Sequence, residues 1–294
     1  MLRSLLRRLS SSRRSTLTIV SRDGESRRTV FEARDTIEAP NWTPDGQWLV
    51  FNGSGALFRV RVDGSERPER IETGSVDAVT NDHVISRDGS TVYFTANGTV
   101  FGVPFAGGTP HVISNDASPG AAAMQYYVHS VSPDGETLCS VGLAKTAGAV
   151  PAIYVHPARG GTGARLTQHS APVDGPDYAA DGQWIYFNGE LNATRAGHSQ
   201  IFRMRTDGSG TEQITRDERV NWFPHPSPDG NALVYLSYPP GTLGHPRRVH
   251  VELHVIPGSG GAPTAIIPLF GGQGSINTNS WSPDSESFAY VEYD

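Results

Sequence analysis

A short turn motif recurs six times along the chain, and it constrains the fold more than any other feature. Each copy places an aspartate, usually between proline and glycine, directly before a segment of apolar residues, as in Pro44-Asp45-Gly46 before Trp48-Leu49-Val50-Phe51. The turn aspartates are Asp45, Asp88, Asp134, Asp181, Asp229 and Asp284, at spacings of 43, 46, 47, 48 and 55 residues. A repeat of this length indicates stacked units of about four strands each.

The same signals follow the turn in each unit. A third apolar segment comes after the second strand, for example at 57–62, 100–104 and 201–205, and a second glycine turn leads to a fourth strand. We therefore predict an all-β fold, a six-bladed β-propeller, because radial repetition of small sheets protects their edges.

The two ends of the chain predict how the ring closes. The last unit stops at Tyr293 after only two strands, whereas the chain begins with two strands, at 16–20 and 28–32, that belong to no complete unit. We expect these four strands to form one blade, so that N-terminal strands close the last blade. The propeller is then a single domain over residues 15–294, preceded by an arm over residues 1–14.

The arm carries five arginines and no acidic residue. Its four leucines have helical spacing: Leu2, Leu5, Leu6 and Leu9. The arm is expected to be helical or disordered, and it could contact a protein partner. An organelle transit peptide is compatible with this composition, but Arg7 and Arg8 interrupt the apolar core that a secretory signal needs. We interpret the chain as cytoplasmic.

Composition excludes several classes of protein. Hydrophobic residues make up 37% of the chain, which suits a folded core and not a disordered chain. The net charge of −6 argues against nucleic acid or anionic lipid as a partner. Cys139 is the single cysteine, so neither an internal disulfide nor a cysteine-based zinc cluster can form. No apolar run is long enough to span a membrane.

The repeat W/S-S/T-P-D-G-x-x-φ-x-F resembles that of TolB-type β-propellers, which are related to WD-repeats, and it extends over nearly the whole chain. A group of small TolB-like proteins is more narrowly similar, through the segments NDHVISRDG, HSVSPDG, NWFPHPSPDG, LGHP and LFGGQGSIN. More remotely, the chain is similar to oligogalacturonate lyases, propellers that bind a divalent metal through histidines and a glutamine, although it lacks their His-x-His pair. These resemblances imply either lyase-like chemistry or a protein-interaction scaffold.

Strand parity predicts which end of the propeller carries the site. The aspartate turns and the second glycine turns share one end, and both are short and uniform. The loops between second and third strands and the connections between blades share the opposite, upper end, where they are longer and chemically diverse. Irregular loops on a rigid scaffold usually carry binding residues, so we expect the site at the upper mouth of the central channel.

Three histidines fit this placement. His83 and His129 lie five residues before the turn aspartate of their repeats and His225 lies four before, so all three are expected to enter innermost strands near the upper end. Three imidazoles around one channel could hold a divalent metal (Mn, Ca or Zn), or one could act as a general base. Alternatively, each could bond to a neighbouring blade or to channel water. The equivalent positions in the other repeats are also polar: Asn41, Asp177 and Asn279.

Other polar residues of the predicted upper end are candidates for substrate binding. They combine carboxylates, an arginine, amides and an aromatic ring, a mixture that suits sugar hydroxyls and carboxylates. The candidates are Glu38, Asp82, Asp177, Glu190, Arg195, Trp222, His245, Gln273 and Asn279. Gly271 and Gly272 lack side chains and would let a ligand approach the backbone. By contrast, His250, Glu252 and His254 alternate along a third strand and are expected to form a hydrated surface stripe.

Two functions follow from these observations. In the first, the protein binds or processes a carbohydrate or sugar acid by lyase-like or hydrolase-like chemistry: a metal or Arg195 neutralises the substrate carboxylate and a histidine takes the proton. In the second, the protein is a TolB-like interaction scaffold without catalysis, and the arm and the uniform blades contact partners.

Overall fold

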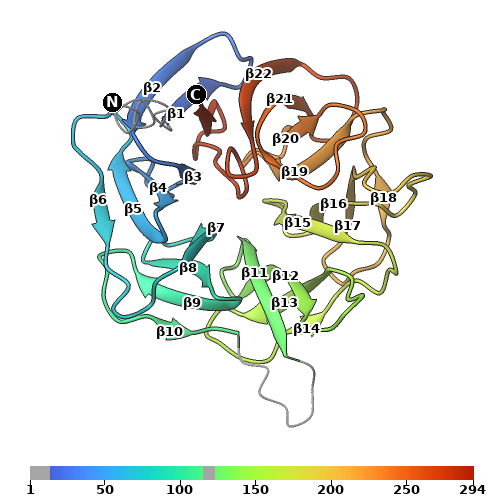
Figure 1. Cartoon of the computed structure of the whole chain (residues 1–294), viewed down its shortest axis with the longest axis horizontal. Coiled ribbons are helices and arrows are strands. Elements are labelled where there is room, and N and C mark those ends of the chain that lie inside the picture. Colours follow the sequence, from blue (N-terminus) through green and yellow to red (C-terminus); the bar gives the residue numbers. More distant parts are fainter. Residues whose placement is uncertain (1–13, 115–122) are drawn as a thin grey trace, which may run out of the picture.

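The computed structural model describes residues 14–114 and 123–294, and it forms a ring of six antiparallel sheets around a central channel (Figure 1). Each sheet is one blade, so the predicted six-bladed β-propeller is confirmed. Within these two ranges no helix is long and apolar enough to cross a membrane. Most of residues 1–14, the predicted arm, lies outside the described part of the chain.

Five blades have four strands each, and they follow one another along the chain. The first consists of β3 (Ile37–Trp42), β4 (Trp48–Gly53), β5 (Ala56–Arg61) and β6 (Glu69–Ile71). The second consists of β7 (Val79–Ile85), β8 (Thr91–Ala96), β9 (Thr99–Pro104) and β10 (His111–Val112). The third consists of β11 (Met124–Val131), β12 (Thr137–Ala144), β13 (Ala152–Pro157) and β14 (Ala164–Arg165).

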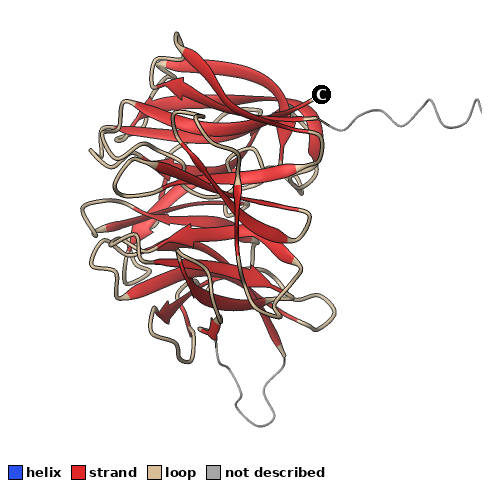
Figure 2. Ribbon diagram, turned by 90° about the vertical axis from the view of Figure 1, so that its left-hand side faces the viewer, coloured by secondary structure: helices blue, strands red, loops and turns tan. Residues whose placement is uncertain are grey.

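The fourth blade consists of β15 (Val173–Tyr178), β16 (Trp184–Gly189), β17 (Gln200–Arg205) and β18 (Glu212–Gln213). The fifth consists of β19 (Val220–Pro226), β20 (Ala232–Tyr238), β21 (Arg247–Pro257) and β22 (Ala265–Gly272). In each blade the first strand lies nearest the channel (Figure 1), and a side view shows the strands running between the two ends of the ring (Figure 2). The first strands therefore carry the residues that face the channel.

Both ends of the chain contribute to the sixth blade, as predicted. β23 (Ser287–Tyr293) pairs with β1 (Ser15–Ser21) in an antiparallel ladder that runs from Ser15 opposite Tyr293 to Ser21 opposite Ser287. β1 also pairs with β2 (Arg27–Ala33), which is the outer strand. Residues 275–282 take the innermost position and are joined to β23 by a bridge between Trp281 and Phe288.

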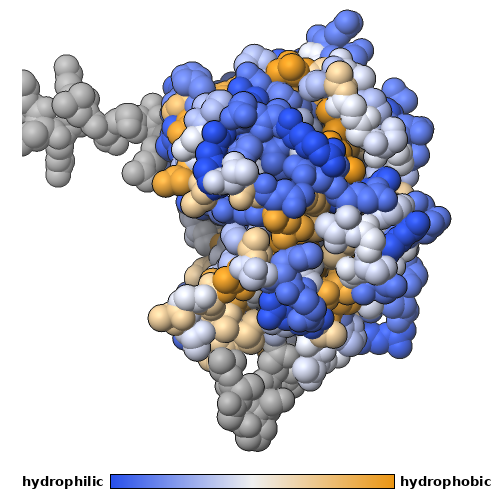
Figure 3. All heavy atoms as spheres, turned by 90° about the vertical axis from the view of Figure 1, so that its right-hand side faces the viewer, coloured by the Kyte–Doolittle hydropathy of each residue, from blue (hydrophilic) through white to orange (hydrophobic). Residues whose placement is uncertain are grey.

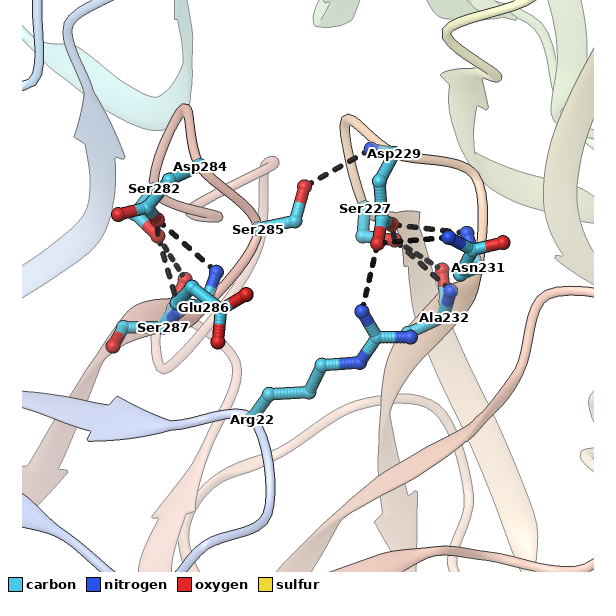
Figure 4. Close-up of polar contacts among 10 residues, drawn as sticks. All are labelled: Arg22, Ser227, Asp229, Asn231, Ala232, Ser282, Asp284, Ser285, Glu286 and Ser287. Atoms are coloured by element: carbon cyan, nitrogen blue, oxygen red, sulfur yellow. Dashed lines mark hydrogen bonds and ion pairs between the residues drawn. The ribbon is translucent and has the colours of Figure 1, made fainter.

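The recurring aspartate forms each turn through local hydrogen bonds. In the fifth blade, Ser227 Oγ donates to Asp229 Oδ1 at 2.5 Å, and the same oxygen accepts from the Asn231 amide at 2.9 Å. Ser282, Asp284 and Glu286 repeat this arrangement in the sixth blade (Figure 4). One carboxylate thus satisfies a hydroxyl and an amide within the turn, which explains why the motif alone fixes the strand boundaries.

These turns also join neighbouring blades. The other five turns have glycine directly after the aspartate, whereas the sixth has Ser285. Ser285 keeps the left-handed conformation of these glycines, with a φ of 65°. Its hydroxyl accepts a hydrogen bond from the Asp229 amide at 3.0 Å, and Arg22 from the β1–β2 turn contacts the Asp229 carboxylate at 2.8 Å (Figure 4). The N-terminal strands are therefore fastened to the fifth blade as well as to β23.

The core lies within and between the blades. Phe51, Phe94 and Phe187 each lie six residues after a turn aspartate, and each is at most 1% exposed. Each ring stacks on a phenylalanine of the third strand of its own blade, at centroid distances of 5.6–5.8 Å. The outer side on which the fourth and fifth blades lie is mostly hydrophilic, with smaller hydrophobic patches between the polar residues (Figure 3). The apolar residues of the repeat are thus used in packing.

Candidate functional site

The channel contains two cavities. The upper one, of about 750 Å³, is bounded by second-to-third-strand turns such as Ser54-Gly55 and by the first residues of innermost strands, such as 79–82 of β7. The lower one, of about 260 Å³, is bounded by the aspartate turns, among them Pro44, Arg87 and Pro228. His129 lines both. The larger cavity therefore lies at the upper end, where the longer and more diverse loops predict the site.

The upper cavity is built mainly from one position of the repeat. Residues seven places before the turn aspartate lie side by side around the channel, and five of the six line the cavity. The six residues are Glu38, Asn81, Tyr127, Asp174, Trp222 and Asn277. Trp222 is the exception, and its neighbour Phe223 lines the cavity instead.

β-Bulges in the innermost strands bring this position into the channel. The pairing register shifts between Glu38 and Asn41 in β3, between Asp174 and Asp177 in β15, and between Trp222 and His225 in β19. An extra residue in a strand breaks the strict alternation of side chains, so two residues three apart can face the same side. In each of these three strands, the residue six places before the turn aspartate has a positive φ: 54° for Ala39, 56° for Gly175 and 54° for Phe223.

His129 and two carboxylates form the centre of the cavity. His129 Nε2 lies 3.6 Å from Asp82 Oδ1 and 3.5 Å from Asp174 Oδ1. These distances are longer than a direct N–H···O hydrogen bond but within the range of an ion pair. Asp82 accepts hydrogen bonds from the Thr80 hydroxyl at 2.7 Å and from the Asn277 amide at 3.0 Å. Burial nevertheless raises the pKa of Asp82, because the charged form is desolvated.

A third carboxylate meets an arginine at the rim. Glu38 Oε1 lies 2.7 Å from Arg247 Nε, and burial raises the pKa of Glu38 although Arg247 opposes this shift. The Glu38 side chain is 9% exposed and that of Arg247 is 48% exposed. Gly274 makes room for Glu38, because a Cβ at this position would lie 2.6 Å from Glu38 Oε1. The cavity is thus acidic inside, with a cation at its opening.

One wall of the cavity is aromatic. The Phe223 ring stacks on His129 with a centroid distance of 6.1 Å and meets the His245 ring edge-on at 5.3 Å. Phe223 is a bulky residue with positive φ, and its amide donates to Asn188 Oδ1 at 3.0 Å. A side chain at Gly175 would clash with both Asn188 and Phe223. The surroundings therefore hold a strained conformation in place, a feature found preferentially at functional sites.

Four residues that line the upper cavity each carry a buried polar atom without a hydrogen-bond partner in the protein. These atoms are Asn52 Oδ1, Asn81 Nδ2, His129 Nδ1 and His245 Nδ1. Buried polar groups in folded proteins are nearly always hydrogen-bonded, so such atoms around a cavity are typical of a site for a polar ligand.

The other two predicted histidines do not line either channel cavity. His83 is fully buried, its Nδ1 donates to Asn41 Oδ1 at 2.7 Å, and burial lowers its pKa to about 3. His225 donates from Nε2 to the Ile276 carbonyl at 2.7 Å, and its Nδ1 lies 3.0 Å from Asp177 Oδ2. The three imidazoles therefore do not meet at one rim.

The three histidines predicted to ligate a metal are therefore not brought together. In residues 14–114 and 123–294, no three side chains of histidine, cysteine, aspartate or glutamate are arranged to hold a metal ion together. His83, His129 and His225 thus do not fit a divalent cation. A divalent cofactor stays a prediction without assigned ligands.

The remaining predicted residues fall into two groups. Glu38, Asp82, His245 and Gln273 line the upper cavity, together with His129. The others lie elsewhere. Asp177 and Asn279 line the lower cavity. Trp222 packs against the His245 ring at a centroid distance of 4.4 Å. Arg195 pairs with Glu218 on an exposed loop, and Glu190 accepts a hydrogen bond from the Gly197 amide in the same loop.

Two expectations about the fifth blade are wrong. The space beside Gly271 and Gly272 is filled by the protein itself, because a Cβ there would lie 2.5 Å from Ser275 Oγ and 2.1 Å from the Pro246 carbonyl. His254 is not on a hydrated stripe: it is 6% exposed, with Nε2 2.7 Å from Glu252 and Nδ1 3.2 Å from the Tyr235 hydroxyl.

Residue-by-residue reasoning missed Asp174, Phe223, Arg247, Tyr127 and Asn277, all of which line the upper cavity. A signal for three of them was present. Asp174, Tyr127 and Asn277 occupy the same repeat position as Glu38, seven residues before the turn aspartate. A proline at the same repeat position also marks three of the bulges, in the pairs Ala39-Pro40, Gly175-Pro176 and Phe223-Pro224.

The fold and the site together define a six-bladed β-propeller with a polar, partly acidic cavity at one end of its channel. Residues 128–244 match the family described as the TolB beta propeller domain. The uncharacterized protein Atu1656 of Agrobacterium fabrum is 38% identical over 288 residues, which cover 96% of this chain and 93% of that protein. The chain belongs to the TolB-like β-propeller family.

Solved structures agree with this assignment. A structure from Agrobacterium tumefaciens that is assigned to TolB is 36% identical, with a TM-score of 0.86, and the match covers 97% of this chain and 99% of that one. An oligogalacturonate lyase in complex with manganese is 15% identical, with a TM-score of 0.54, over 76% of this chain and 64% of the lyase. The second likeness concerns the fold alone.

Proposed function

We propose that the upper cavity binds a small polyhydroxylated molecule of the carbohydrate type. The observation that carries this proposal is the set of buried, unpartnered amide and imidazole atoms around a cavity of about 750 Å³. Donors and acceptors of this kind suit a ligand with several hydroxyl groups, and the Phe223 wall suits the apolar face of a sugar ring.

His129 is the residue that we propose for acid–base chemistry in this cavity. Its Nε2 lies 3.6 Å from Asp82 Oδ1 and 3.5 Å from Asp174 Oδ1, so the imidazole is held beside two carboxylates in the wall of the cavity. Lyase-like and hydrolase-like reactions both need a proton transfer. For a sugar acid, Arg247 would replace the predicted Arg195 as the cation near the substrate carboxylate, since Arg247 lines the cavity and Arg195 does not.

The alternative is an interaction scaffold without catalysis. Membership in the TolB-like family favours it as much as it favours a ligand-binding role. Its proposed contacts are the N-terminal arm and the outer faces of the blades. The cytoplasmic location also stays a prediction.

A binding and turnover screen tests the proposed function. We expect at least one member of a panel of neutral hexoses, hexuronates and hexosamines to bind, as measured by calorimetry, and His129→Ala to weaken binding or turnover by about tenfold or more. The matched control is His250→Ala, because His250 is an exposed histidine of a third strand. If no panel member binds, or if both variants behave like the parent protein, the cavity is not the site and the scaffold becomes the better explanation.

A further inference from the structure

The carboxylates of the upper cavity are unequally paired with cations. Three carboxylates line the cavity, those of Glu38, Asp82 and Asp174, and their side chains are 9%, 10% and 23% exposed. A desolvated carboxylate is costly unless a positive charge or several hydrogen-bond donors compensate it. The cations and donors that already contact each carboxylate therefore indicate which groups a ligand has to supply.

The arginines at the rim are already used. Arg247 pairs with Glu38 at 2.7 Å. Arg248 donates to the Asp294 carbonyl at 2.9 Å and to the Thr36 hydroxyl at 3.4 Å. Neither guanidinium is paired with either of the other two carboxylates.

Asp82 and Asp174 have no such partner. Among the described residues the structure shows no arginine or lysine paired with either one, and His129 is the only side chain in ion-pair range. A single imidazole can neutralise one of the two charges at most. The two carboxylates therefore share one imidazole as their only ion-pair neighbour in the described part of the chain, and a ligand that brings a positive charge or several donors would complete their surroundings.

An organic cation meets these conditions better than a metal ion. The side chains are not arranged to ligate a metal together, and the cavity is much larger than a bare ion needs. An ammonium group brings a positive charge and three donors, which suit carboxylate oxygens. Asn52, Asn81 and His245, which also line the cavity, offer amide and imidazole groups for hydroxyl groups on the same molecule.

We propose that the ligand of the upper cavity is an amino-polyol of the hexosamine type, and that its ammonium group lies beside His129 against Asp82 and Asp174. This inference rests on the proposed function, since it names the charge of the molecule that the same cavity takes. Asp174 is the more accessible of the two carboxylates and is therefore the principal contact of the ammonium group.

The experiment compares sugars of similar size that carry a positive, a neutral or a negative substituent. Glucosamine, galactosamine and mannosamine are titrated calorimetrically beside their N-acetyl forms, the parent hexoses and the hexuronates, at a pH where the amines are protonated. We expect a hexosamine to bind about tenfold or more tightly than its uncharged counterparts. Asp174→Asn should remove this preference, whereas the control Glu218→Gln, which changes an exposed carboxylate outside the cavity, should keep it. Circular dichroism and melting temperature establish that both variants are folded.

Three results would overturn the inference. Tighter binding of a neutral sugar or a uronate would refute the cationic ligand and leave the proposed carbohydrate site intact. A preference for amines that survives in Asp174→Asn would refute the placement of the ammonium group. Binding by no member of the panel would refute the proposed function and the inference together.

Discussion

At the scale of single residues, the histidines of the channel differ in how their ring nitrogens are used. Both nitrogens of His225 have partners, the Asp177 carboxylate and the Ile276 carbonyl, and the ring is 1% exposed. Asp177 also accepts from the Asn279 amide at 2.9 Å. His225 therefore joins the fifth blade to the fourth and to the innermost segment of the sixth. His129 instead faces a cavity on either side.

This difference predicts opposite consequences of two similar substitutions. His225→Ala should lower the free energy of unfolding by about 3 kcal/mol, because the buried Asp177 carboxylate loses its contact with the imidazole and keeps the Asn279 amide as a donor. His129→Ala should cost less than half as much, since its ring contacts cavities as well as protein. Urea unfolding of both variants measures the two losses. Equal losses would mean that His225 is no more structural than His129.

At the scale of single elements, the aspartate turns predict how the protein responds to acid. Hydrogen bonds from Ser86 and from the Ser90 amide and hydroxyl lower the pKa of Asp88 to about 2. The hydroxyl two residues earlier is likewise the main cause of the lowered pKa of Asp45, Asp134 and Asp284. Because the folded pKa values lie below the unfolded one, these turns stabilise the fold fully above about pH 4 and lose that contribution as the pH falls towards 2.

Melting temperatures between pH 6 and pH 2 measure this loss. We expect the parent protein to lose stability steeply over the lower half of that range. Ser86→Ala removes the largest cause of the lowered pKa of Asp88, so it should destabilise the protein at pH 6 and make the acid dependence shallower. Asp88→Asn removes the titrating group and should also flatten the curve. Parallel curves for all three proteins would show that the turn at Asp88 does not contribute to acid unfolding.

The elements also explain what could be predicted from the sequence. The turn motif is closed by contacts between residues two places apart, such as Ser132 with Asp134, so the sequence alone places the strands and the blades. The site depends on bulges in the innermost strands, where strict alternation fails. Glu38 is predicted from its charge and from its place before the first innermost strand. Its equivalent Asp174 is missed, because the alternation of side chains, counted back from the turn aspartate, does not point residue 174 towards the channel unless the bulge is known. Arg247 enters the cavity through an insertion that the repeat does not predict.

At the scale of the whole molecule, the ring exposes few edges that could pair with another chain. The outer strands β10, β14 and β18 have two residues each, and β22 carries Pro268. Short edge strands and edge prolines disfavour pairing with another chain. Apart from the seven-residue outer strand β2, a scaffold role would therefore depend on side chains, among which Leu243 at 72% and Ile266 at 53% are the most exposed large apolar residues of the described chain.

The integrity of the ring depends on the ladder between β1 and β23. Every other blade is a continuous segment of chain, whereas the sixth combines residues near the two ends, which the pairing of β1 with β23 joins. Thr18 lies in the middle of β1, which is paired with β23 on one side and with β2 on the other. A proline here cannot donate to either neighbour and distorts a central strand.

We therefore expect Thr18→Pro to cost about 3 kcal/mol or more and to broaden the urea transition, because the sixth blade separates before the others. Val112→Pro is the matched control: Val112 is 52% exposed in the two-residue strand β10, and the neighbouring Ile113 supplies the amide that bonds to the Val100 carbonyl. This control should cost less than about 1 kcal/mol. If Thr18→Pro unfolds as cooperatively and at the same urea concentration as Val112→Pro, the ring is held closed by contacts between blades, such as Arg22 with Asp229, and not by the terminal ladder.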